Sequence, residues 1–223
     1  MPKLSIYGGA MCAGKTKKVI EIVSTSALVN NNKIALYANH SIDNRDGEKP
    51  FSSHSSLLAD VNPVKTDIED ITSDFIENCL DNETYVLFTK ISSLEELWPA
   101  LRTGKIDLLA IDEGQFFSDI HRADLIVNEF EIDVVIGGLI GDIHRNKFGG
   151  ILDLLPKADE FIFLQALCTR CLLHGEKRNA PFSFKHSSTP LDEQFENKEE
   201  NVVEVGGSDK YMALCRECYN SLH

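Results

Sequence analysis

The stretch that decides the fold lies near the amino terminus and reads Gly9-Ala10-Met11-Cys12-Ala13-Gly14-Lys15-Thr16. It matches the pattern G-x-x-x-x-G-K-[ST], in which backbone N–H groups and a helix N-terminus surround a phosphate. Residues 3–7 before it read as a short strand, and residues 17–23 after it carry apolar side chains at helical spacing. This order predicts a nucleoside triphosphate site, where Lys15 neutralises the phosphates and Thr16 offers a hydroxyl to Mg²⁺.

Strand-like and helix-like segments alternate through the first two-thirds of the chain. Residues 106–111 are apolar nearly throughout, as strands buried in parallel sheets are. In the helix predicted for 93–101, Ser93 and Glu96 have the spacing of a capping box, and Pro99 is expected to bend or shorten it. The other predicted elements are strands at 3–7, 33–37, 85–88, 133–137 and 160–164 and a helix at 117–130. The alternation predicts an α/β fold, a P-loop NTPase-like and mostly parallel sheet flanked by helices.

Composition and charge favour an enzyme that acts on a small ligand. The 223 residues carry a net charge of −13, which disfavours nucleic-acid partners. The chain shows neither the pattern of a secretion signal nor an apolar run of the ~20 residues that cross a membrane. We therefore expect a cytoplasmic protein without nucleic-acid or membrane partners.

Two acids, Asp112 and Glu113, follow the apolar strand 106–111. Ligands of parallel sheets gather at the carboxyl ends of the strands, so both acids are candidates for the chemistry. Asp112 is placed to hold Mg²⁺ beside the hydroxyl of Thr16, and Glu113 points elsewhere, toward a second substrate. The alternative interpretation is a solvated turn.

Four of the six cysteines form two C-x-x-C pairs, which are Cys168 with Cys171 and Cys215 with Cys218. Two such pairs predict a tetrahedral Zn²⁺ site, and four sulfur ligands leave no open position, which indicates a structural role. Free thiols are the alternative, and a nucleic-acid zinc ribbon is opposed by the acidic charge. We expect a P-loop domain at 1–165 and a small zinc-binding lasso domain at 166–223.

The run Asp112-Glu113-Gly114-Gln115-Phe116-Phe117 resembles the D-E-x-Q-F-F motif of the type II, or cytosolic-type, thymidine kinases. Asp43-Asn44-Arg45 is similar to the D-x-R segment of that family, and Phe148-Gly149 to its F-G. Residues 203–211, which run into Cys215, are similar to its carboxyl-terminal stretch. The matching motifs span nearly the whole chain.

The resemblance implies that ATP phosphorylates the 5′-hydroxyl of thymidine, giving thymidine 5′-monophosphate and ADP in deoxynucleoside salvage. Glu113 is then the general base. The implied donor and Mg²⁺ residues are Gly9, Ala10, Met11, Cys12, Ala13, Gly14, Lys15, Thr16, Asp43, Arg45, Asp112 and Gln115. The implied nucleoside residues are Met11, Phe116, Leu139, Ile143, Ser183, Val205, Gly206, Gly207, Ser208 and Tyr211. The family also implies a homotetramer inhibited by dTTP.

For some of these residues a purely structural role is the alternative to a functional one. Asp43 and Arg45 are alternatively a surface ion pair, and Met11 and Leu139 taken alone are alternatively plain core residues. Cys12 is most simply a small apolar residue of the loop.

The sequence departs from the family pattern mainly on the nucleoside side. Ile140 and Ile143 replace the Asp and the aromatic of L-D-x-x-F, and Lys185 replaces an Arg. Asp142 is a candidate to compensate for the lost acid. Kinase activity is therefore better supported than strict thymidine preference. The alternatives are a kinase of another deoxynucleoside, an NTP hydrolase in which Glu113 activates water, and a zinc-ribbon binding module.

Overall fold

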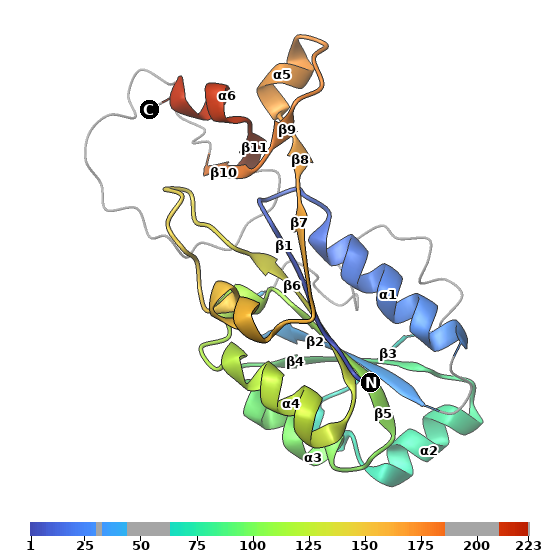
Figure 1. The fold of residues 1–223 in the computed structure, drawn as a ribbon. Helices are drawn as coiled ribbons and strands as arrows, with labels where there is room; N and C mark the ends of the chain where they lie inside the picture. The colour runs from blue at the N-terminus through green and yellow to red at the C-terminus, as the bar shows by residue number, and fades with distance from the viewer. Residues whose placement is uncertain (30–32, 44–62, 186–209, 223) are drawn as a thin grey trace.

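A seven-stranded parallel sheet forms the centre of the protein (Figure 1). The computed structural model describes residues 1–29, 33–43, 63–185 and 210–222. The strand order is β3-β4-β2-β5-β6-β1-β7, and every neighbouring pair is parallel. The strands are β1 (Leu4–Gly9), β2 (Ile34–His40), β3 (Val64–Lys65), β4 (Val86–Ile91), β5 (Ile106–Asp112), β6 (Asp133–Leu139) and β7 (Glu160–Leu164).

Helices cover both faces of this sheet, which confirms the predicted fold class. On one face, Val19, Ile20 and Val23 of α1 pack against Tyr37 and Phe88 of the sheet. The opposite face packs against the other helices, as Figure 1 shows. The helices are α1 (Lys15–Val29), α2 (Ser73–Asp81), α3 (Trp98–Leu101) and α4 (Ala123–Phe130), with 3₁₀ turns η2 (Ile68–Asp70), η3 (Leu94–Leu97), η4 (Gly114–Phe116), η5 (Ile120–Arg122) and η6 (Ile151–Lys157).

The predicted strands are confirmed with ends that differ by a few residues, whereas two helix predictions needed correction. Residues 93–101 fold as the turn η3 followed by α3, and the Ser93–Glu96 capping box is present. The helix predicted at 117–130 begins only at Ala123, so that prediction was wrong for residues 117–122. There the carboxylate of Asp119 accepts a hydrogen bond from the hydroxyl of Ser93 at 2.8 Å, which ties this stretch to η3.

The carboxyl-terminal part folds as two small antiparallel pairs and two short helices beyond the carboxyl ends of β1 and β7 (Figure 1). Its own apolar cluster includes Phe184, Leu214 and Tyr219. The elements are β8 (Ala166–Leu167), α5 (Thr169–Leu173), β9 (Asn179–Ala180), β10 (Phe182–Lys185), β11 (Tyr211–Leu214) and α6 (Arg216–Asn220). In the described ranges, no helix has both the length and the apolar character needed to span a bilayer.

Gly149 offers a test of how the fold positions the turn after β5. Its φ is +65°, and an added Cβ would lie 2.3 Å from the carbonyl oxygen of Gln115. Gly175 has a similar φ of +76° but no atom within 4 Å of an added Cβ. We expect both alanine variants to lose about 1–3 kcal/mol through backbone strain.

Gly149→Ala should lose roughly another 1–3 kcal/mol because the backbone of Gln115 cannot yield cheaply. Urea unfolding of the two variants measures the difference. Equal losses would show that the contact with Gln115 does not constrain the fold.

Candidate active site and metal centre

The glycine-rich loop joins the end of β1 to the start of α1, as the sequence predicted. Cys12 and Gly14 both have left-handed backbone conformations, with φ of +60° and +81°. The side chain of Lys15 is buried, and its Nζ donates a hydrogen bond to the carbonyl oxygen of Ala10 at 2.7 Å. The loop therefore curls around the ammonium group of Lys15 at a helix N-terminus, an arrangement suited to binding phosphate.

Asp112 is buried at the carboxyl end of β5 and is surrounded by donors. Its carboxylate accepts hydrogen bonds from the hydroxyl of Tyr37 at 2.7 Å, from the backbone N–H of Glu113 at 3.0 Å and from the side chain of Thr16. Burial, followed by the charge of Glu113, raises the pKa of Asp112 to about 6, while these hydrogen bonds lower it.

The structure brings Thr16 and Asp112 together, the pair that the sequence assigned to Mg²⁺. A hydroxyl and a carboxylate are hard oxygen ligands of the kind that Mg²⁺ prefers. The phosphates of a bound nucleotide and water would complete an octahedral shell. The donor set therefore fits the ion.

Glu113 is buried and follows Asp112 in a left-handed conformation, with φ of +53°. Its Oε2 accepts a hydrogen bond from Nε2 of Gln115 at 2.5 Å. The Oε1 of Gln115 in turn accepts from the backbone N–H of Leu139 at 2.8 Å. Gln115 thus connects the carboxylate of Glu113 to the end of β6, and the left-handed turn lets the two adjacent acids have different partners.

Asp43 lies at the same edge of the sheet and is almost fully buried, which does not fit the alternative of a surface ion pair. The Nδ2 of Asn39 donates to Oδ2 of Asp43 at 3.1 Å, and Nζ of Lys90 donates to its carbonyl oxygen. Asn39 is also the register partner of Asp112 between β2 and β5. Arg45 lies outside the described residues.

Sequence reasoning missed Tyr37 and Asn39, which hold the two buried aspartates. Tyr37 is at the middle of β2, and Asn39 lies at its polar carboxyl end beside His40. That position was a usable signal, because the carboxyl end of a parallel strand is where ligands bind.

The predicted nucleoside residues are brought together in part. The backbone N–H of Met11 donates to the hydroxyl of Ser183 at 3.0 Å, which joins the phosphate loop to β10. Leu139 is buried at the end of β6, beside the end of β1. The ring of Phe116 contacts the rings of His40 and Phe148. Tyr211 is buried in β11. Val205, Gly206, Gly207 and Ser208 lie outside the described residues.

The structure shows contacts of Ile140, Asp142 and Ile143 in the segment that departs from the family pattern. Ile140 lies against Gly8 and next to Phe161 on the sheet. The carboxylate of Asp142 accepts from the backbone N–H groups of His144 and Asn146 at 2.9 and 2.7 Å, so it stabilises the turn that follows Ile140. The carbonyl oxygen of Ile143 accepts from the hydroxyl of Tyr219 at 2.5 Å.

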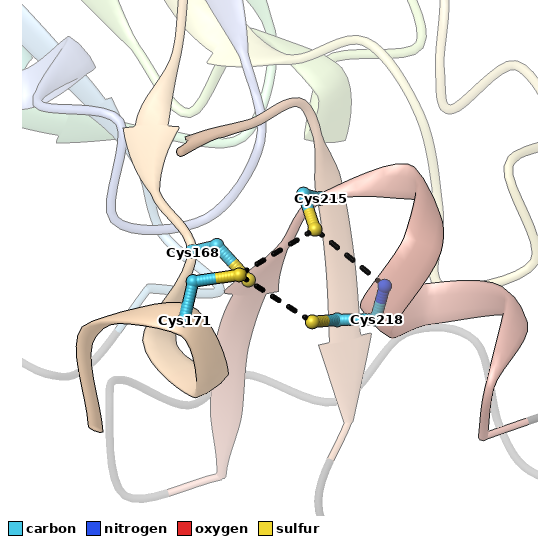
Figure 2. Close-up of side chains that lie close together, drawn as sticks. All are labelled: Cys168, Cys171, Cys215 and Cys218. Atoms are coloured by element: carbon cyan, nitrogen blue, oxygen red, sulfur yellow. Dashed lines mark hydrogen bonds between the residues drawn. The ribbon is translucent and has the colours of Figure 1, made fainter. Parts of the chain in front are cut away.

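The four paired cysteines converge on one point, as Figure 2 shows. Their sulfur atoms all lie within 4.8 Å of one another, and Cys171 is 3.9 Å from Cys215 and 3.6 Å from Cys218. Sulfurs bound tetrahedrally at the Zn–S distance would be about 3.8 Å apart. The cluster Cys168, Cys171, Cys215 and Cys218 therefore fits a structural Zn²⁺ ion.

Comparison with known proteins gives a family for this arrangement. The family model described as thymidine kinase matches residues 2–88 and 77–219. The chain belongs to the thymidine kinase family. A thymidine kinase of fowlpox virus is 29% identical over 98% of this chain and 97% of its own length. One from Oryza sativa is 29% identical over 97% of this chain and 66% of its own length.

A further relative is the cytosolic thymidine kinase of Cricetulus griseus, which is 33% identical over 50% of this chain and 42% of its own length. Membership of this family makes the chain an enzyme, a kinase that transfers a phosphoryl group. In the motif Asp112–Phe117 that indicated the family, the structure gives two adjacent acids different hydrogen-bond partners.

Tyr37→Phe should raise the pKa of Asp112 above its value of about 6 in the metal-free protein. The hydrogen bond from the phenol stabilises the ionised carboxylate, so losing that bond favours the protonated form. Carbon-13 NMR titration of the carboxyl group measures the shift. Tyr85→Phe is the matched control, because Tyr85 packs in the same cluster as Tyr37. If the pKa of Asp112 is unchanged in Tyr37→Phe, the phenol of Tyr37 does not stabilise the ionised carboxylate.

Cys215→Ser should abolish stoichiometric zinc, measured by elemental analysis of the purified protein. Serine retains an acceptor for the backbone N–H of Cys218, so the helix cap of α6 survives while the metal ligand is lost. We expect a lower melting temperature than for Cys12→Ser, whose cysteine is exposed and outside the cluster. Full zinc content in Cys215→Ser would rule out this site.

Proposed function

We propose that the protein phosphorylates the 5′-hydroxyl of thymidine with ATP, releasing thymidine 5′-monophosphate and ADP. The observation that carries the proposal is that the adjacent carboxylates of Asp112 and Glu113 have different hydrogen-bond partners. The carboxylate of Asp112 accepts from Tyr37 and Thr16 on the phosphate-loop side, whereas the carboxylate of Glu113 accepts from Gln115. We assign the first carboxylate to the donor and its metal and the second, which the left-handed turn at Glu113 directs to different partners, to the acceptor.

The proposed reaction is an in-line transfer. Glu113 accepts the proton of the 5′-hydroxyl as that oxygen bonds to the γ-phosphorus, and the bond from phosphorus to the β-γ bridging oxygen breaks to release ADP. Lys15 and the backbone N–H groups of residues 10–14 stabilise the charge on the donor phosphates. Mg²⁺, when bound by Thr16 and Asp112, supplies further neutralisation of these phosphates.

The hydrogen bond from Gln115 gives Glu113 a fixed direction. With its Nε2 on Glu113 and its Oε1 on the backbone of Leu139, the amide of Gln115 is held at both ends. General-base catalysis requires the carboxylate within hydrogen-bond reach of the hydroxyl, so a fixed orientation supports the role we assign to Glu113.

The domain division at residue 165, the homotetramer, inhibition by dTTP and a cytoplasmic location are part of the same proposal. They rest on family membership rather than on the contacts described above. The roles of Arg45 and of residues 205–208 in binding ATP and the nucleoside are proposed on the same basis.

Glu113→Gln tests the general base. We expect the turnover number for thymidine phosphorylation to fall by about 10²–10⁴-fold, because the amide cannot take the proton. The affinity for ATP should be unchanged. Glu83→Gln is the control, since Glu83 has the same left-handed conformation but is exposed. Near wild-type thymidine phosphorylation by Glu113→Gln contradicts the proposal.

The same assays separate the rival activities. ATP turnover at the full rate without any nucleoside would identify an NTP hydrolase instead. A panel of thymidine, deoxyuridine and deoxycytidine then defines the acceptor, and a clear preference for deoxycytidine would point to Ile140 and Ile143 as the residues that changed it.

A further inference from the structure

A cavity of about 350 Å³ lies where the phosphate loop meets the carboxyl-terminal part of the chain. It is bounded by the end of β1, the turn after β6, the end of β7, β10 and the start of α6. The lining residues used below are Ile140, Asp142, Arg145, Phe163, Phe182 and Arg216.

This cavity borders the proposed catalytic centre but does not coincide with it. Its lining includes Gly9, Ala10 and Ser183, but it does not include Lys15, Asp112 or Glu113. Of the residues assigned to the nucleoside, Ser183 is the only one in the described part of the chain that lines it. A ligand here would therefore lie beside the phosphate loop without touching Lys15, Asp112 or Glu113.

Two guanidinium groups are held at the wall of the cavity by aromatic faces. Arg145 lies 4.6 Å from the ring centre of Tyr219 and 5.6 Å from that of Phe182, and Arg216 lies 4.9 Å from the ring of Phe182. A guanidinium over an aromatic ring is attracted by the negative face of the ring, and it keeps further N–H groups that can bind an anion.

Carboxylates do not neutralise these two arginines within the described residues. Neither Arg145 nor Arg216 forms an ion pair there, although the chain as a whole carries a net charge of −13. Arg145 instead donates to the side-chain oxygen of Asn220 at 3.4 Å. Asp142 is the one carboxylate in the lining, and it already accepts the backbone N–H groups of His144 and Asn146.

The rest of the lining is largely apolar, with Ile140, Phe163 and Pro181. The volume lies within the range of small-molecule sites, which are mostly apolar with a few convergent polar groups. A single phosphate ion would leave most of this space empty. The charge and the shape of this cavity therefore suit a ligand with a doubly charged anionic end and an apolar body.

We propose that this cavity binds a small organic phosphate monoester. Its phosphate lies between Arg145 and Arg216, whose planar forks match phosphate oxygens in pairs. Its apolar part lies against Ile140, Phe163 and Pro181. Because the lining comes from both the sheet and the carboxyl-terminal part, the ligand would also stabilise the contact between the two.

Phenyl phosphate is a suitable probe, and titration calorimetry on the full chain measures its binding. The Lys15→Ala variant serves as the background, because it weakens phosphate binding at the loop. In that background we expect binding to persist, and to fall at least tenfold when Arg145→Gln and Arg216→Gln are added. Arg170→Gln, which changes an arginine of the same part of the chain outside the lining, should leave the affinity unchanged.

Ile140→Asp provides a second variant that leaves both arginines in place. It adds a carboxylate to the lining and should also weaken phenyl phosphate at least tenfold. Inorganic phosphate and thymidine 5′-monophosphate, tested in parallel, distinguish a bare anion from a nucleotide, and weaker binding of inorganic phosphate than of either ester is expected. Loss of all binding in Lys15→Ala, or unchanged binding after the arginine or Ile140 substitutions, would overturn the proposal. Thymidine phosphorylation is tested separately by Glu113→Gln, which changes no residue of this lining.

Discussion

The hydrogen bond between Thr16 and Asp112 joins two elements that lie on either side of β6, and the rest of the site depends on this close approach across β6. Strand β6 lies between β5, which ends in Asp112, and β1, which leads into the phosphate loop. At the crossing point β6 has Gly137, where an added Cβ would lie 3.0 Å from Oδ1 of Asp112 and 2.7 Å from Val19 of α1. Any side chain there would separate the helix from the carboxylate.

The parallel pairing of the strands determines which other side chains lie near Thr16 and Asp112. Because all the central strands run the same way, their carboxyl ends share one edge, and the polar residues that follow or end them meet there. Asn39 and Asp112 are neighbours in register, and Asp43 folds back onto Asn39. Buried polar groups need partners. Asn39 and Asp43 bond to each other, and Asp112 accepts from Tyr37.

The sequence was sufficient to predict the phosphate loop, the acids after β5 and the four cysteines, because each is defined by short-range spacing. It was also sufficient for the parallel strands, whose apolar runs are continuous. It was not sufficient for Tyr37, whose hydroxyl reaches a residue 75 positions away, or for the bridge from Gln115 to Leu139. Such contacts depend on strand order and register. The helix predicted at 117–130 was wrong only for residues 117–122, where Asp119 bonds to Ser93, a partner that local periodicity does not reveal.

Met11 and Ser183 contribute different kinds of atoms to the hydrogen bond that joins them. Met11 contributes only its backbone N–H, so other side chains could replace it without breaking the connection. Ser183 contributes its hydroxyl, so only a residue with a similar acceptor could take its place. The side chain at position 11 can therefore change during evolution, and with it the shape of the neighbouring pocket. Position 183 is limited to serine or a close equivalent such as threonine.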